Sequence, residues 1–433
     1  MNHRRRQRAR HHESAEREHG QEGHGPRIDH PLVPKGEHEV LRSAAEVEAF
    51  AAHARAVGML AFDTEFIGEE SFRPRICLVQ VATPERVALI DPLEGVDPRP
   101  IYEVAADPAV TTLVHAGEQD IGAVRDALGR SIENVVDTQI AVSMIGLPWP
   151  SSLGTTLETF VGLRLDKAHT FTEWDRRPLT ASQLHYAADD VRYLPMAWDA
   201  VRRQLESCGR LQWVLQESAA QLAGESEFDP ERQMRRASRG EPLRPAATTL
   251  LRELVLLRRE LAREMDQPQR VVIPDNALME LVRRKPERAS EVREVRFLPN
   301  PVAGQHGDRI AECVRRAREL PPTRDEHAKL LEDATVRARI DALWLALQAR
   351  CIADQMAPNL LCSRSEFTDW CATRITRERR QQRGESVGET PSAFPVGDWR
   401  MQAAGDWLQS FVEGNAELRL RWDPQLGAIR PVS

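Results

Sequence analysis

The chain has 433 residues, of which 41% are hydrophobic and 5% are aromatic, and its formal net charge is −7. This length predicts two or three domains, and the hydrophobic share is too high for a chain that is disordered throughout. A negative net charge does not indicate a nucleic-acid-binding protein, although it is compatible with a local basic groove. No apolar run approaches the ~20 residues that a membrane-spanning helix needs. No apolar stretch follows the basic start at Met1 to Arg10, so we expect no secretory signal either.

The cysteines and basic residues add two weaker indications. The six cysteines are scattered without any C-x-x-C pair, which argues against a zinc site or a disulfide framework and is typical of a cytoplasmic protein. Only four of the 59 basic residues are lysine. The arginine surplus suits phosphate recognition, but codon bias in a GC-rich genome explains it equally well.

Residues 1–36 are rich in Arg, His and Glu and nearly free of apolar side chains, so we predict a disordered arm there. An α/β domain is predicted over 37–221. Its strand candidates are Met59–Phe62, Ile76–Ala82, Val87–Ile90 and Thr111–Val114.

Helices are predicted between and after these strands. Ile121, Val124 and Leu128 recur at helical spacing after the fourth strand. A further helix is predicted from Leu184 to Leu205, where Pro195 should kink or divide it.

The rest of the chain is predicted to be helical. We expect a linker at 222–243, a helical domain at 244–322, and a second helical domain with a C-terminal tail at 323–433. Residues 250–265 form an amphipathic pattern, whereas 297–307 have the Pro/Gly content of a connection. The segment 268–278 is echoed by 358–367, which suggests two related helical modules, although chance similarity competes with this reading.

The first segment whose side chains could bind a metal or take part in catalysis is Asp63-Thr-Glu65. Residues two apart on a strand point to the same face, so both carboxylates project together. Two such carboxylates at the end of an apolar strand repel each other unless a cation joins them, and hard oxygen ligands suit Mg²⁺ or Mn²⁺. By itself the motif is weak, because strands commonly end in acidic turn residues.

The second segment is His115-Ala-Gly-Glu-Gln-Asp120, which leaves the fourth strand and opens the next helix. Asp120 is a candidate ligand, Glu118 is its nearby rival, and a simple helix cap is the alternative role. The third segment is Tyr186-Ala-Ala-Asp-Asp190. Tyr186 and Asp190 share a helix face, whereas Asp189 is rotated away.

Together the three segments supply four carboxylates, enough to hold two divalent ions about 3.5–4 Å apart as in phosphodiester hydrolysis. One ion would lower the pKa of the attacking water and the other would stabilise the leaving 3′ oxygen. The Tyr186 hydroxyl could orient that water.

In these motifs the chain resembles the DEDD 3′→5′ exonucleases with a tyrosine in the third motif, and among them the ribonuclease D family. Further resemblance lies at 88–93, at 137–139, at 165–167 followed by Trp174, and at 177–180, so that 58–205 is covered densely. The resemblance implies an α/β ribonuclease-H-like domain with a mixed central sheet flanked by helices. It also implies two divalent ions (Mg²⁺ or Mn²⁺) and stepwise release of 5′-mononucleotides from RNA.

The resemblance also implies roles for the catalytic and metal-binding residues Asp63, Glu65, Asp120, Tyr186 and Asp190. Asp63 would bridge both ions, Glu65 and Asp190 would hold the water-activating ion, and Asp120 would hold the other.

Weaker substrate contacts are implied for Phe66, against a terminal base, and for Lys167, at a phosphate. Surface or core placement is at least as good an account of each. We expect His115 and Asp137 to be structural.

The helical region resembles the HRDC module, best over 250–281. We therefore predict an exonuclease domain followed by all-α HRDC-type domains, acting on structured RNA 3′ ends such as tRNA precursors and not on a membrane. Two alternatives stay open: a DNA 3′→5′ exonuclease of the same superfamily, and a catalytically silent RNA-binding protein that keeps the fold.

Overall fold

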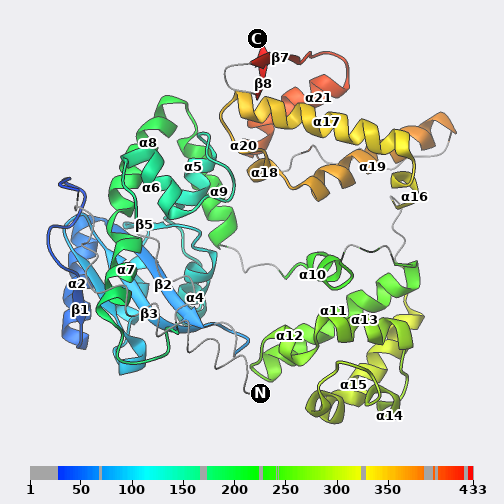
Figure 1. Cartoon of the computed structure of the whole chain (residues 1–433), viewed down its shortest axis with the longest axis horizontal. Coiled ribbons are helices and arrows are strands. Elements are labelled where there is room, and N and C mark those ends of the chain that lie inside the picture. Colours follow the sequence, from blue (N-terminus) through cyan, green and yellow to red (C-terminus); the bar gives the residue numbers. More distant parts are fainter. Residues whose placement is uncertain are drawn as a thin grey trace, which may run out of the picture.

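The chain folds into an α/β domain and two helical units, which Figure 1 shows in a computed structural model. The structure describes residues 28–67, 71–165, 173–223, 228–239, 241, 243–322, 328–384, 394, 398–423 and 428–432. The α/β domain spans 28–223, the first helical unit 228–322 and the second helical unit 328–432. None of the described helices is long and apolar enough to cross a membrane.

A six-stranded mixed sheet forms the centre of the α/β domain. Its strands are β1 (Glu39–Leu41), β2 (Met59–Ile67), β3 (Arg75–Ala82), β4 (Val87–Ile90), β5 (Thr111–Val114) and β6 (Val135–Asp137). They lie in the order β1-β4-β3-β2-β5-β6, and only β3 runs antiparallel to its neighbours. The predicted mixed sheet is therefore confirmed, and all four predicted strands are present.

Helices cover both faces of this sheet. They are α2 (Ala44–Val57), α3 (Arg99–Ala105), α4 (Glu118–Leu128), α5 (Thr138–Ser143), α6 (Leu153–Val161), α7 (Ala181–Arg192), α8 (Leu194–Ser207) and α9 (Leu211–Ala223), with a 3₁₀ turn at Pro92–Glu94. Side chains of β2 alternate between two cores, as strand geometry requires. Phe62 joins the core with α2 and α3, and Ala61 joins the core with α7 and α8.

The helix predicted from Leu184 to Leu205 is divided in two, as Pro195 indicated. α7 ends at Arg192, and α8 starts at Leu194 with the proline in its first turn. A proline is tolerated there because its missing N–H would have no partner within the helix. α7 begins with a capping box formed by Thr180 and Gln183.

Residues 28–36, which we expected to belong to a disordered arm, pack on the α/β domain. Val33 is buried with Tyr193 and Met196. The carbonyls of Pro34 and Gly36 accept hydrogen bonds from Arg192 at 3.2 and 3.0 Å. The fully buried Arg192 guanidinium thus anchors this segment, a long-range contact that local composition does not encode.

The first helical unit contains α10 (Pro230–Ala237), α11 (Pro245–Glu264), α12 (Gln269–Val272), α13 (Asp275–Arg284), α14 (Ala289–Val292) and α15 (Asn300–Glu319). Helix α10 occupies the stretch that we expected to be a linker. Buried Arg258 of α11 binds Gln233 of α10 at 3.0 Å and Asp275 of α13 at 2.7 Å. The connection predicted over 297–307 was also wrong beyond residue 299, because α15 starts at Asn300 with Pro301 at its first turn.

The second helical unit repeats part of the first. Its helices are α16 (Ala328–Leu331), α17 (Ala334–Ala353), α18 (Pro358–Leu361), α19 (Arg364–Gln382), α20 (Asp398–Arg400) and α21 (Asp406–Val412), with a π-helical turn at Met401–Gly405. The succession α17-α18-α19 matches α11-α12-α13 in order, with a four-residue middle helix in each case. Beyond the expected helices it carries a hairpin of β7 (Arg419–Asp423) and β8 (Ala428–Val432).

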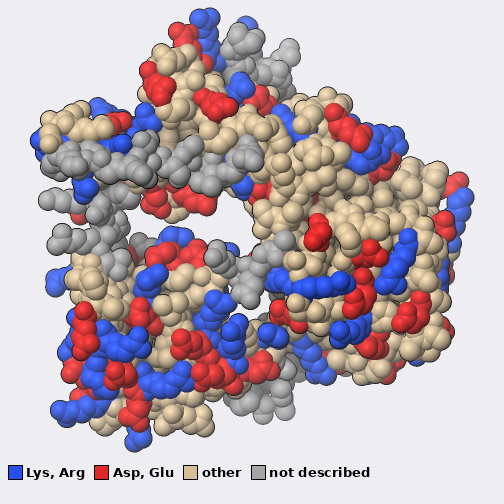
Figure 2. Space-filling model, turned by 180° about the vertical axis from the view of Figure 1, so that it is seen from behind, with Lys and Arg blue, Asp and Glu red and all other residues tan. Residues whose placement is uncertain are grey.

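The second helical unit docks on the α/β domain through a buried ion pair. Glu217 of α9 is 2% exposed and accepts hydrogen bonds from Arg400 at 2.5 and 2.6 Å and from the Trp399 indole at 2.7 Å. Arg210 reaches the carbonyls of Met144 and Asp354 at 2.7 and 2.6 Å. Figure 2 shows an opening between the α/β domain and the helical units, and basic and acidic side chains interspersed on the first of these units.

Candidate metal and catalytic centre

Strand β2 delivers two carboxylates to one end of the sheet. Asp63 lies opposite Gln80 and Glu65 opposite Leu78, so both project from the same face of β2. Helix α7 supplies Asp190. Ligand oxygens of Asp63, Glu65 and Asp190 all lie within 4.8 Å of one another. The structure thus brings together three of the four predicted carboxylates.

The fourth carboxylate, Asp120, lies beside this group. It is the third residue of α4, is 6% exposed, and accepts a hydrogen bond from the Thr64 hydroxyl on β2. Among the described residues it is not a member of the group whose oxygens lie within 4.8 Å. The alternative candidate Glu118, at the start of the same helix, is exposed.

The loop that leads into α4 is shaped by close packing and by Asp137. Ala116 adopts a left-handed backbone (φ 59°), and its N–H donates to Asp137 at 3.0 Å, while the Gly117 N–H donates to the other oxygen at 3.1 Å. A Cβ on Gly117 would lie 2.4 Å from the Cβ of Val114, so only glycine fits there. His115 bridges Thr138 and the Ser151 carbonyl at 2.9 and 3.0 Å, a structural position.

Helix α7 presents Tyr186 and Asp190 to the site. The Tyr186 hydroxyl donates a hydrogen bond to the Asp190 carboxylate, and the Tyr186 ring stacks with Trp174 at a centroid distance of 6.3 Å. Asp189 turns away and pairs with Arg192 at 3.1 Å and His185 at 3.3 Å. Adjacent aspartates of one helix therefore have separate surroundings.

Burial raises the pKa of all four carboxyl groups, and repulsion within the cluster adds to this effect for Asp63 and Glu65. Burial first, and then the charges of Asp120, Asp190 and Glu65, raise the pKa of Asp63 well above its ordinary value. Burial together with the charges of Asp190 and Asp120 raises the pKa of Glu65 to about 8. Burial raises the pKa of Asp190 to about 7 against the opposing hydrogen bond from Tyr186.

Asp120 and Tyr186 follow the same trend. Burial raises the pKa of Asp120 to about 6, against the lowering effect of the Thr64 hydrogen bond. Burial and the neighbouring carboxylates hold the pKa of Tyr186 well above its ordinary value, so its hydroxyl stays protonated at neutral pH and does not act as a general base.

These residues fit hard divalent cations. The ion pairs formed by described residues include none to Asp63, Glu65, Asp120 or Asp190, so no Lys or Arg is seen to neutralise the cluster. Four acidic groups that are costly to ionise together are the donor set that Mg²⁺ or Mn²⁺ stabilises. The chemistry of the donors therefore supports divalent metal binding.

The two weaker substrate contacts have different outcomes. Phe66 follows Glu65 across an irregularity in β2 and is partly exposed. Lys167 lies outside the described residues. Sequence reasoning missed Thr64 and the stacking role of Trp174. Thr64 gives no signal because it sits between two ligands, whereas Trp174 was visible only as part of the family resemblance.

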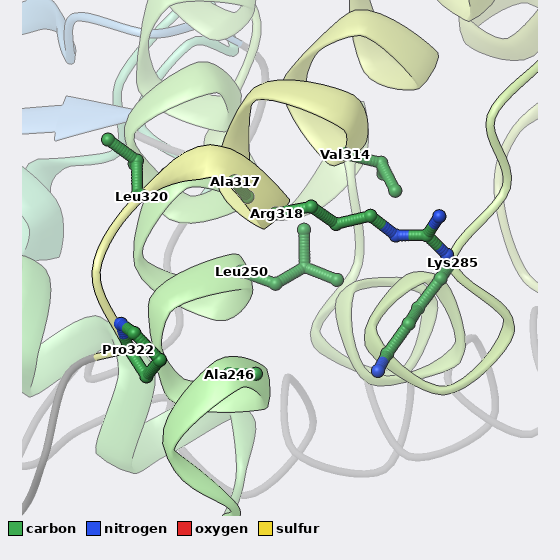
Figure 3. Close-up of a pocket in the computed structure, with 8 residues that line it drawn as sticks. All are labelled: Ala246, Leu250, Lys285, Val314, Ala317, Arg318, Leu320 and Pro322. Atoms are coloured by element: carbon green, nitrogen blue, oxygen red, sulfur yellow. The ribbon is translucent and has the colours of Figure 1, made fainter.

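A separate small pocket lies in the first helical unit. It has a volume of about 120 Å³, and its lining includes Leu250, Val314, Lys285 and Arg318 (Figure 3). Arg318 pairs with Glu287. No carboxylate lines this pocket, so it has no part in the metal centre.

Known proteins resemble this chain in sequence and in fold. A family model described as 3′-5′ exonuclease matches residues 39–206, and one described as HRDC domain matches 247–314. The chain is 31% identical over 346 residues to the Ribonuclease D of Granulibacter bethesdensis, covering 77% of this chain and 86% of that relative. It is 30% identical over 388 residues to the Ribonuclease D of Zymomonas mobilis, covering 87% and 94%. The crystal structure of Escherichia coli RNase D shares the fold with a TM-score of 0.70 at 24% identity, covering 88% of this chain and all of that one.

Proposed function

The chain belongs to the ribonuclease D family and is a 3′→5′ exoribonuclease, and from this premise we propose which residues perform the reaction and on which RNA. The single observation that carries the assignment is the cluster of Asp63, Glu65 and Asp190, whose oxygens lie within 4.8 Å of one another beside buried Asp120.

We assign the divalent-metal site to these four carboxylates and propose two ions, Mg²⁺ or Mn²⁺. Asp63 would be a ligand of both ions, because the charges of Asp120, Asp190 and Glu65 all act on it. Glu65 and Asp190 would hold the ion next to the attacking water, and Asp120 the ion next to the leaving oxygen. When bound, such ions lower the pKa of water and neutralise charge on the phosphate and the leaving 3′ oxygen.

The protein's own groups orient the reactants. The Tyr186 hydroxyl donates a hydrogen bond to Asp190, so its lone pairs can accept a hydrogen bond from the attacking water. Stacking with Trp174 holds the phenol in place. Thr64 on β2 donates a hydrogen bond to Asp120 on α4 and so holds that carboxylate at the edge of the site.

The substrate is proposed to be the 3′ end of structured RNA, with tRNA precursors as the first candidate. The similar E. coli protein is described as an exoribonuclease involved in structured RNA processing. Phe66, which is partly exposed and follows Glu65 in the sequence, is proposed to pack on the terminal base, and Lys167 to meet a phosphate. We further propose a cytoplasmic location, since all six cysteines are free thiols.

A time course on 5′-labelled tRNA with a short 3′ trailer tests the proposal. Matched reactions contain Mg²⁺, Mn²⁺ or EDTA, and single-stranded DNA of equal length runs in parallel. We expect metal-dependent shortening by one nucleotide at a time, slower on DNA because it lacks the 2′-hydroxyl.

Two variants make the test specific. Asp63→Asn should abolish shortening, whereas Asp126→Asn, on the exposed face of the helix that carries Asp120, should not. Equal rates on DNA would favour a DNA exonuclease. RNA binding without shortening under any metal would favour a silent RNA-binding protein.

A further inference from the structure

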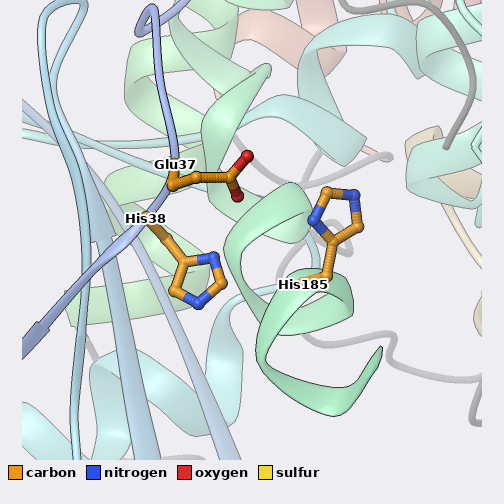
Figure 4. A group of neighbouring side chains, drawn as sticks. All are labelled: Glu37, His38 and His185. Atoms are coloured by element: carbon orange, nitrogen blue, oxygen red, sulfur yellow. The ribbon is translucent and has the colours of Figure 1, made fainter. Parts of the chain in front are cut away.

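A second cluster of metal-binding side chains lies away from the carboxylate centre. Glu37 and His38 immediately precede β1, and His185 lies on α7. One potential ligand atom from each lies within 4.8 Å of the other two, and Figure 4 shows the three side chains gathered between the two segments. Among the described residues, this is the only such group besides Asp63, Glu65 and Asp190.

His38 has an unsatisfied atom in this cluster. Its Nδ1 is buried and has no hydrogen-bond partner in the described structure. In Figure 4 a ring nitrogen of His38 points towards Glu37 and His185. Buried polar atoms almost always have a partner, and an orphan of this kind calls for an explanation such as an ion.

His185 is oriented in the manner of a metal ligand. Its Nε2 lies 3.3 Å from Asp189, and the other nitrogen is on the side facing Glu37. Metal-binding histidines characteristically give one ring nitrogen to a carboxylate and the other to the ion, which sets the tautomer. Asp189 is held in turn by Arg192 at 3.1 Å.

Arg192 also positions the opposite side of the cluster. It donates to the carbonyls of Pro34 and Gly36, directly before Glu37 and His38. Asp189 opposes the positive charge of Arg192 within this cluster.

We propose that Glu37, His38 and His185 bind one Zn²⁺-class transition-metal ion, which ties the segment before β1 to α7. Two imidazole nitrogens and one carboxylate oxygen are a ligand set that suits such ions and leaves a fourth position for water. Bonds of ~2.1 Å require the donor atoms to approach to roughly 3.4 Å in tetrahedral geometry. The exposed Glu37 side chain can make this adjustment.

The position of the site defines its consequence. His185 and Tyr186 are adjacent on α7, so the ion sits on the helix face next to the one that carries Tyr186 and Asp190. An ion there closes the long loop between residues 38 and 185 and stabilises the folded α/β domain. This inference does not depend on the ribonuclease assignment, because binding is measured without RNA.

The test counts ions on the full-length protein in excess Mg²⁺. Mg²⁺ occupies the oxygen-ligand centre but is poorly bound by imidazole, so added Co²⁺ reports the histidine site. Bound Co²⁺ is counted by equilibrium dialysis, and its visible absorption reports four-coordination. Thermal unfolding is followed with and without Zn²⁺.

Four proteins are compared: the natural sequence, His38→Gln, His185→Gln and the control His53→Gln. His53 lies in the same domain but contacts Thr83 at 3.0 Å. Histidines near the N-terminus are common to all four, so their binding cancels.

We expect His38→Gln and His185→Gln each to bind one Co²⁺ fewer than the natural protein and to lose the four-coordinate absorption. The natural protein and the control should gain roughly 5 °C in Tm at a Zn²⁺ concentration 100-fold above Kd, and the two variants should not. Equal ion counts in all four proteins would overturn the proposal. So would an equal loss in His53→Gln. If His185→Gln does not fold, His38→Gln decides the question alone.

Discussion

Replacing Asp63 with asparagine should make the metal-free protein more stable while destroying its activity. Asp63 is surrounded by Glu65, Asp120 and Asp190, and burial and repulsion raise its pKa. Asparagine has nearly the same shape as aspartate but cannot carry its negative charge. We expect the free energy of unfolding at pH 8 in EDTA to rise by about 1–3 kcal/mol, because a pKa change of one unit corresponds to about 1.4 kcal/mol.

The sign of the pH dependence follows from the raised pKa values. A carboxyl group whose pKa is higher in the folded than in the unfolded protein binds its proton more tightly in the folded state. The protein therefore loses stability as pH rises from the unfolded-state pKa to the folded-state pKa. Glu65 titrates near 8, Asp190 near 7 and Asp120 near 6 in the folded state. The stability of the metal-free protein should therefore fall from about pH 4 to pH 8.

Thermal unfolding at several pH values, with EDTA or with Mg²⁺, measures both effects. Mg²⁺ should restore the stability of the natural protein at pH 8 and do little for Asp63→Asn. Exonuclease turnover should drop by about 10³-fold or more, since loss of a metal ligand removes several kcal/mol of transition-state stabilisation. Asp126→Asn serves as the control. A metal-free Asp63→Asn protein less stable than the natural one at pH 8 would refute the repulsion argument.

Three other substitutions and one titration test further parts of the structure. Tyr186→Phe should lower turnover by only about 10-fold in the same assay, since it removes one hydrogen bond; a loss as large as that of the asparagine variant would contradict its orienting role. Gly117→Ala should destabilise the protein by about 1–3 kcal/mol in denaturant unfolding, because its Cβ would lie 2.4 Å from that of Val114. Glu217→Ala should cost about 3 kcal/mol by leaving Arg400 without its carboxylate, and tryptophan fluorescence should report early release of the second helical unit; unchanged unfolding would argue against the docking role. Mg²⁺ affinity, measured by calorimetry, should rise steeply between pH 6 and 8 as the raised carboxyl groups ionise, and a flat profile would contradict the assigned ligands.

Local patterns predicted the strands and the chemical motifs well. The alternation along β2 and the i, i+4 spacing of Tyr186 and Asp190 depend on the geometry of single elements, which a sequence expresses directly. Pro195 marked the break between two helices for the same reason. Such features need no knowledge of distant contacts.

Predictions failed where distant residues decide the outcome. Segment 28–36 has the composition of an arm, yet Arg192 holds it against the α/β domain. Residues 230–237 read as a linker, but Arg258 ties that helix into the core of the first helical unit. In both cases a buried guanidinium donates the hydrogen bonds, and the local sequence does not show which distant arginine will bind the segment.

The sequence by itself predicted that Asp63 pairs with Glu65 and Tyr186 with Asp190, because strand and helix periodicity places each pair on one face of its element. Only the tertiary structure decided that Asp120 lies beside the other three carboxylates, where it accepts a hydrogen bond from Thr64. The physical reason is that periodicity describes one element at a time. The distance between ligands from β2, α4 and α7 is set by how those elements pack across the sheet.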